Sequence, residues 1–216
     1  MSRPAGGAVR SAGWVACLVL AAGCSSSGPA PEQRTAAPRT VEIAEACPGL
    51  LNEAAAQAVE RTLQSSALVR DEGQAVGAEG IGAALEAAYK AGPAAGETAV
   101  TPCVMTGQVG GGDRRAELRL GADSGGPGVR VRADARQAAV SFDCVSTRVG
   151  STTDLPLRIT STFTDHWQKT APTEGPPDTY LTVAHSAALA MAQHLSCDNT
   201  GNLPPRPTAL PPPSAP

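Results

Sequence analysis

The chain has 216 residues, and its 17 Lys and Arg against 20 Asp and Glu give a net charge of −3 at pH 7. Phosphate binding depends on clustered Lys and Arg, so this acidic chain is not expected to bind nucleic acid. Its densest basic groups, Arg114-Arg115 and the alternating Arg130 and Arg132, have the pattern of solvated strand faces. Aromatic residues make up only 3% of the chain, which disfavours a glycan-binding platform of stacked rings.

Residues 1–23 have the pattern of an export signal. Arg3 and Arg10 precede a short apolar run, residues 14–22, and no acidic residue occurs before Glu32. A bilayer-spanning helix needs about 20 apolar residues, so this run is too short for a transmembrane anchor. We therefore expect residues 1–23 to be a signal peptide that is removed, which leaves a net charge of 15 − 20 = −5.

The residues before Cys24 resemble the lipobox of bacterial lipoproteins. Leu20, two alanines and Gly23 precede Cys24, although Ala21 stands where the family most often has Leu. The resemblance implies that Cys24 carries a diacylglyceryl group with palmitate-type chains, and two acyl chains anchor a protein stably. We expect a lipid-anchored protein on the extracytoplasmic face of the cell membrane, with the lipid bilayer as a partner. An ordinary secretory signal cut near Ala22 is the alternative.

Two low-complexity segments flank the central part of the chain. Residues 25–40 are rich in Ser, Ala and Pro and have no apolar periodicity, so they cannot offset the entropy cost of becoming ordered. We expect residues 24–40 to be a flexible tether that holds the next domain roughly 20–25 Å from the lipid surface. Residues 202–216 contain seven Pro, which predicts a disordered tail of polyproline-II character.

Residues 41–201 are long enough for one domain with its own core, and their apolar periodicity predicts three helices. The first covers residues 49–65. The second begins near residue 74 or 79 and ends at Gly92, since Gly followed by Pro is a helix stop. The third covers residues 180–197 and closes the domain.

Alternation of apolar and polar residues predicts strands between the second and third helices, with Gly-rich turns as connections. The order helix, helix, strands, helix indicates an α+β fold. We expect an antiparallel sheet of about four to five strands, covered by two N-terminal helices and one C-terminal helix. The candidate strands are 100–109, 116–120, 129–133, 140–144 and 157–163.

Four cysteines remain in the domain: Cys47, Cys103, Cys144 and Cys197. An even number in an exported chain predicts two disulfides, and the sequence allows three pairings. We favour Cys47–Cys103 with Cys144–Cys197, because each would tie a helix end to a nearby strand within its own half. Each loop would span about 55 residues, for which the chain-entropy model gives about 4 kcal/mol. No Cys-x-x-Cys pair occurs, which argues against a zinc site.

Two short segments resemble chymotrypsin-like serine proteases. Residues 123–127, Asp-Ser-Gly-Gly-Pro, resemble the segment around that family's nucleophile, and residues 181–185 resemble the segment that carries its catalytic His. The family places its His before its Ser, whereas every His here follows Ser124, and His185 lies in a helical pattern. Because a triad can occur in any chain order, Ser124 with His185 stays open, against a hairpin turn and a helix histidine.

His166 is a second candidate for hydrolase chemistry. Asp165 could orient it as a general base, but adjacent strand residues point to opposite faces, so we expect an exposed loop His.

His185 and His194 are half a turn out of phase on a helix and cannot share a metal. The Gly-rich segment 107–112 lacks the Lys and the helix that follow a phosphate loop and is predicted to be a turn. The sequence therefore predicts no metal and no cofactor.

The chain as a whole is similar to small actinobacterial cell-envelope lipoproteins of unknown function. The similarity is carried by the lipobox, the Ala/Gly/Pro-rich composition, the Cys-Pro-Gly-Leu-Leu segment 47–51 and the segment 190–204 around Cys197. It implies no activity. We expect a non-enzymatic, membrane-tethered domain that binds an unidentified envelope protein or small ligand. The alternative is an envelope hydrolase that uses Ser124 or His166.

Overall fold

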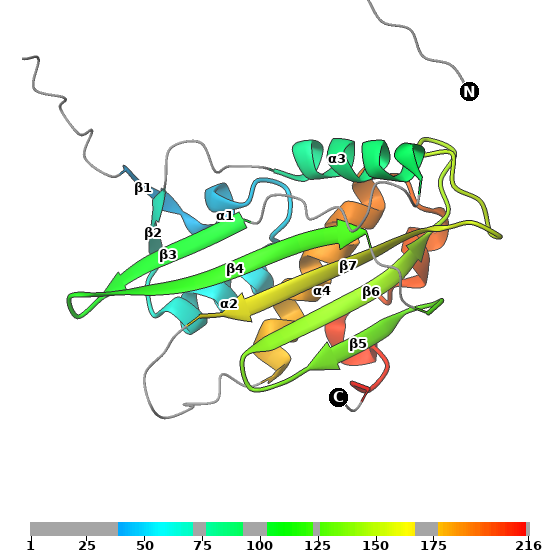
Figure 1. The fold of residues 1–216 in the computed structure, drawn as a ribbon. Coiled ribbons are helices and arrows are strands. Elements are labelled where there is room, and N and C mark those ends of the chain that lie inside the picture. The colour runs from blue at the N-terminus through cyan, green and yellow to red at the C-terminus, as the bar shows by residue number, and fades with distance from the viewer. Residues whose placement is uncertain (1–38, 71–76, 93–102, 123–125, 167–176, 215–216) are drawn as a thin grey trace, which may run out of the picture. The chain divides into compact units, whose positions relative to one another are not determined.

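A computed structural model of the protein describes residues 39–70, 77–92, 103–122, 126–166 and 177–214. They form an α+β fold with a seven-stranded antiparallel sheet, which confirms the predicted class (Figure 1). The sheet has more strands than the expected four to five, because two strands of four residues each extend it at one edge. In sheet order the strands are β1 (Arg39–Glu42), β2 (Ala67–Arg70), β3 (Cys103–Val109), β4 (Gly112–Ala122), β7 (Leu157–Asp165), β6 (Gln137–Cys144) and β5 (Arg130–Ala133).

The sheet order does not follow the chain, because β7 lies between β4 and β6. β3 and β4 form a hairpin, as do β5 and β6, and β7 pairs with one strand of each. Gly110 and Gly111 connect β3 to β4 with φ of +57° and +82°, values that glycine adopts without strain. The predicted turn in segment 107–112 is therefore confirmed at its second half, whereas its first half belongs to β3.

The helices lie on one face of the sheet (Figure 1). The predicted first helix, 49–65, is shorter in the structure, because the side chain of Asn52 accepts a hydrogen bond from the amide of Ala55 and caps it. The predicted third helix begins three residues earlier than expected and ends at His194. The helices are α1 (Ile43–Ala46), α2 (Glu53–Leu63), α3 (Ala78–Ala91) and α4 (Pro177–His194), followed by short 3-10 turns at Asp198–Asn202 and Pro207–Ala209.

The hydrophobic core lies between the sheet and α2, α3 and α4. Strand residues alternate, so that every second side chain of β4 and β7 is buried on the helix side. α4 runs along β6 and β7 and is buried along most of its length, with Val183, Ala187 and Met191 fully covered. The other face of the sheet carries polar and charged side chains and has no described helix over it.

Two disulfides attach helix ends to the sheet. Cys47 after α1 is bonded to Cys103 at the start of β3, and Cys144 at the end of β6 is bonded to Cys197 after α4. This is the connectivity that the sequence favoured among the three possible pairings. The bridges close loops with sequence separations of 56 and 53 residues.

Residues 203–214 lie against the domain, whereas composition predicted a disordered tail from residue 202. Leu203 is 5% exposed, and the carbonyl of Pro204 accepts a hydrogen bond from the ring of His185. Further along, Leu210 packs on the core and the amide of Ser214 donates to the carbonyl of Val131 in edge strand β5, at 2.9 Å. Proline restricts the backbone without preventing the leucines between prolines from packing, which explains the difference.

Candidate functional site

The open face of the sheet, opposite the helices, is a polar surface that no described helix covers. Directly paired residues on antiparallel strands share a face, so the register gives rows of neighbours across the sheet. One row crosses four strands from Arg132 on β5 through Ala139 and Thr162 to Arg119 on β4. The next row runs from Arg130 through Ser141 and Thr160 to Gly121.

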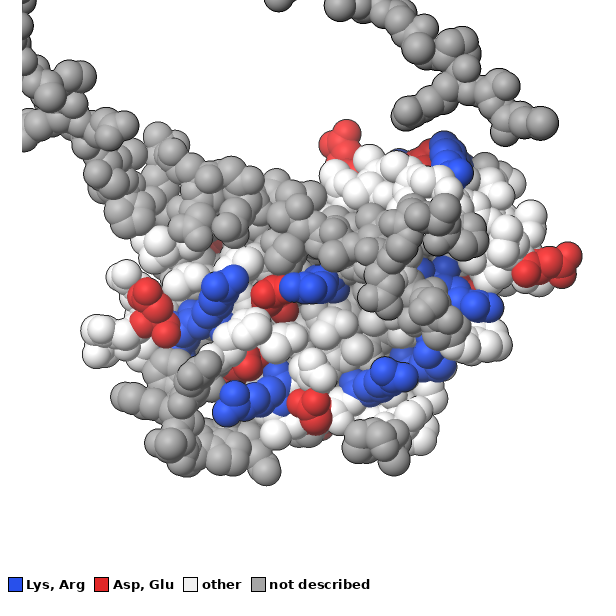
Figure 2. All heavy atoms as spheres, in the orientation of Figure 1, with Lys and Arg blue, Asp and Glu red and all other residues white. Residues whose placement is uncertain are grey.

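These two central rows have small side chains in the middle and an arginine at three of their four ends. Thr160 and Ser141 are hydrogen-bonded through their hydroxyls at 2.6 Å. Arg119 and Arg132 are exposed. Figure 2 shows this face, with Lys and Arg side chains spread across it and acidic side chains between them. The rows therefore present guanidinium and hydroxyl groups, which are hydrogen-bond donors suited to anionic groups.

Glu117 lies beside the central rows and contacts two neighbours. One of its carboxylate oxygens accepts from Arg119 Nη2 at 2.6 Å and from Nε at 3.0 Å, and the other is 3.4 Å from His166 Nε2. The carboxylate is largely covered, with 12% of the side chain exposed, whereas 44% of the His166 side chain is exposed. The His166 imidazole therefore lies beside the Glu117 carboxylate.

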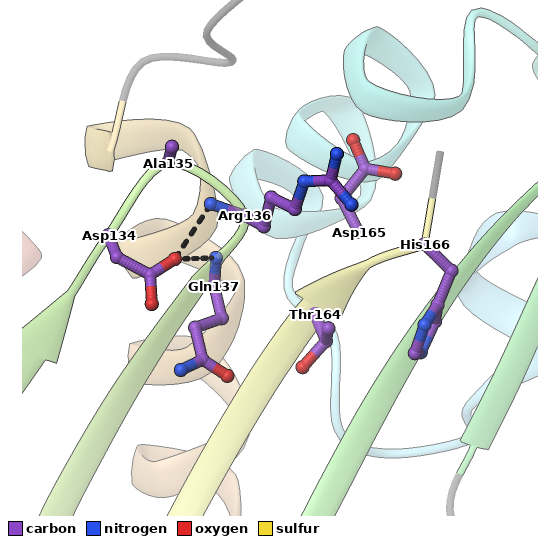
Figure 3. A pocket seen from close by; sticks show the side chains of 7 residues that line it. All are labelled: Asp134, Ala135, Arg136, Gln137, Thr164, Asp165 and His166. Atoms are coloured by element: carbon purple, nitrogen blue, oxygen red, sulfur yellow. Dashed lines mark hydrogen bonds between the residues drawn. The ribbon is translucent and has the colours of Figure 1, made fainter. Parts of the chain in front are cut away.

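A shallow pocket of about 480 Å³ lies next to His166, where the β5–β6 turn meets the end of β7 (Figure 3). Asp134 shapes the turn, since one carboxylate oxygen accepts from the amides of Arg136 and Gln137 at 2.8 and 2.9 Å. The pocket is lined by Asp134, Ala135, Arg136, Gln137, Thr164, Asp165 and His166.

The side chains of Asp165 and His166 point to opposite faces of the sheet, as the strand geometry predicted. Asp165 accepts a hydrogen bond from the hydroxyl of Tyr180 on the helix side, at 3.1 Å, while His166 lies beside Glu117. Burial, together with the nearby Asp165 carboxylate, raises the pKa of Tyr180 to about 12, so this phenol stays protonated as a donor. His166 is exposed after the end of β7, as expected, but the carboxylate beside its ring belongs to Glu117 and not to Asp165.

The sequence missed Glu117 because the pairing of β4 with β7 brings it to His166. The available signal was the alternation in β4, which places Glu117 on the solvent side. Nothing in the sequence indicates that β7, rather than β5, lies beside β4.

The other candidate for hydrolase chemistry does not form a site among the described residues. His185 is 2% exposed in α4, and its Nε2 donates to the carbonyl oxygen of Pro204 at 2.8 Å. Burial lowers its pKa, so the ring is a neutral core histidine. His194 lies near the end of α4, where its ring is packed against Gly82 of α3. Ser124 and the acylation candidate Cys24 lie outside the described residues.

Neither a metal centre nor a membrane span occurs in the part of the chain that the structure describes. There, no three His, Cys, Asp or Glu side chains come close enough to hold a metal ion. No helix among these residues is both long and apolar enough to cross a bilayer. No protein-family model, curated protein or solved structure matches the chain.

Proposed function

We propose that this protein is a membrane-anchored, extracytoplasmic binding domain. Acylated Cys24 holds it to the outer face of the cell membrane, residues 25–38 act as the tether, and the domain presents its open sheet face to an envelope partner. The observation that carries this proposal is the division of the sheet into two faces. α1 to α4 cover one face, and the other displays arginines and hydroxyls in register across four strands.

The lipobox motif and the disulfides support the proposed location. The motif implies acylation at Cys24, and two disulfides in a chain of this size are typical of an oxidising compartment. A sheet face suits binding, because residues on regular strands hold their positions better than residues on loops.

Site-specific photo-crosslinking in living cells tests this function. A photo-reactive amino acid replaces Thr162 in the centre of the open face, and in a matched variant it replaces Glu60, which is exposed on α2. We expect a crosslinked product of defined size from position 162 and none from position 60. Cys24→Ala should abolish it, since the unacylated chain is not presented in the same place. Equal products from both positions, or none from position 162, would contradict the assignment.

An envelope hydrolase that uses Ser124 or His166 is the second candidate. The observation that favours its His166 form is that His166 lines the pocket beside the Glu117 carboxylate, because an imidazole within reach of a substrate can act as a general base toward water. A fluorophosphonate probe tests the Ser124 form: labelling of the native chain but not of Ser124→Ala supports it. Hydrolysis of an ester panel that is lost in His166→Gln supports the His166 form.

A further inference from the structure

The open face has the opposite sign of charge from the chain as a whole. Among the described strand residues, five arginines belong to it against four carboxylates, although the chain carries a net charge of −3. Such a surplus attracts anionic groups and repels cationic ones. The arginines are Arg115, Arg119, Arg130, Arg132 and Arg158, and the carboxylates are Glu42, Asp113, Glu117 and Asp143.

The carboxylates lie outside the two central rows. Glu117 flanks them on one side, paired with Arg119, and Asp143 flanks them on the other, 3.4 Å from Arg158 Nε. The central rows therefore form a narrow band of three arginines with Ser141, Thr160 and Thr162 between them, which we call the arginine–threonine band. Anionic groups of a partner are favoured within this band and are disfavoured beside it.

The length of the arginine–threonine band matches an extended polypeptide. Arg119 and Arg132 are three strand spacings apart, which is about 14 Å at roughly 4.8 Å per spacing. In an extended chain, side chains four residues apart point the same way and are separated by about 13–14 Å. Two carboxylates at such positions would reach both guanidinium groups, with the intervening residues over Ala139 and Thr162.

A bilayer surface and a second copy of this chain fit the arginine–threonine band less well. Adsorption to anionic lipid gains only about 1 kcal/mol per basic residue, and here two carboxylates flank the band. The exposed large apolar side chain among the described residues is Leu155, which lies in the loop before β7 and not on this face. A two-fold dimer through this face would bring its arginine surplus against an identical surplus.

We propose that the arginine–threonine band binds an extended, carboxylate-bearing segment of a partner protein, which crosses β5, β6, β7 and β4. The inference rests on the proposed function and names the partner class for that face. Arg132 binds one carboxylate through its forked N–H groups, and Arg119 binds the other through the N–H groups that do not bond Glu117. The hydroxyls of Thr160 and Thr162 donate to the segment's backbone.

Binding of a labelled hexaglutamate peptide to the purified full chain tests this inference. We expect fluorescence anisotropy to show binding that weakens with salt and falls about tenfold or more in the double variant Arg119→Gln/Arg132→Gln. Arg119→Lys/Arg132→Lys keeps the charge but loses the forked N–H groups, so its affinity for the peptide should lie between those of the native chain and of the Gln variant. All these side chains are exposed, and unchanged urea unfolding confirms that the variants fold.

The matched control, Arg61→Gln/Arg206→Gln, removes the same charge from exposed positions on α2 and near the C-terminus. We expect it to change affinity less than about twofold. Equal losses in both double variants would overturn the inference, as would absence of peptide binding. Stronger binding to polyphosphate or to phosphatidylglycerol vesicles than to the peptide would overturn it as well.

The failure of this inference can be told apart from failure of the proposed function. Crosslinking from position 162 that persists unchanged in Arg119→Gln/Arg132→Gln keeps the binding face and rejects a carboxylate-bearing partner. Absence of a crosslinked product from position 162 in the otherwise native chain rejects both the proposed function and this inference.

Discussion

His185 is buried in α4 without a charged partner, and this gives the domain a pH-dependent stability. Burial lowers its pKa below the ordinary value of 6.5, while the unfolded chain keeps that value. As the pH falls below about 6.5, the unfolded state takes up a proton that the folded state resists, so the free energy of unfolding decreases. Above that pH both states are neutral at this position and the contribution vanishes.

His185→Gln should reduce this loss of stability. The amide of Gln can still donate toward Pro204 but does not titrate, so urea unfolding at about pH 7.5 and about pH 5.5 should differ less than in the native chain. An identical difference in the native chain and in His185→Gln would show that other groups cause the acid sensitivity.

Gly201 occupies a position that no other residue can fill without a rearrangement. It has φ of +65° within residues 199–202, all of which have positive φ, and a Cβ would clash with a ring carbon of Phe142. Gly201→Ala should therefore lower the free energy of unfolding by about 2–4 kcal/mol, through backbone strain and overpacking. Gly150→Ala is the matched control, since Gly150 has φ of +84° with nothing within 4 Å of its Cβ position. We expect Gly150→Ala to lower the free energy of unfolding, measured with urea, by only about 1 kcal/mol. Equal losses in Gly201→Ala and Gly150→Ala would rule out the Phe142 clash as the cause.

At the scale of elements, the helices follow from local sequence and the edge strands do not. Ala55, Ala58 and Val59 share one face of α2 and are all fully buried, as their spacing indicates. β1 and β2 escaped prediction because each has four residues and pairs only with segments that are 25 or more residues away along the chain. β1 also begins at Arg39, within the predicted tether 24–40.

The C-terminal segment 203–214 is an element that composition alone misassigned. Deleting residues 203–216 should lower the free energy of unfolding by about 2–4 kcal/mol, because it exposes the core beneath Leu203 and removes the acceptor of His185. Deleting only residues 211–216 removes the Ser214–Val131 hydrogen bond and should cost about 1 kcal/mol. Urea unfolding of both truncations checks this, and a stability equal to that of the full chain would mean that the segment is a free tail.

For the whole molecule, the sequence predicts the fold class and the disulfides but not the candidate binding face. Alternation placed Arg130 and Arg132 on a solvated strand face, which agrees with their positions on β5. The arginine–threonine band could not be predicted, because it depends on the insertion of β7 between β4 and β6. That order depends on long-range strand pairing, which the period of a single strand does not encode.

The two disulfides have a consequence for how the chain acquires its covalent structure. Cys47 pairs with Cys103 and Cys144 with Cys197, so the cysteines of the domain pair in the order in which they occur, and the two loops do not overlap. In an oxidising compartment that receives the chain N-terminus first, Cys103 reaches its native partner before either later cysteine has arrived. The native connectivity can then form by consecutive oxidation, and no mispaired bond has to be exchanged by an isomerase.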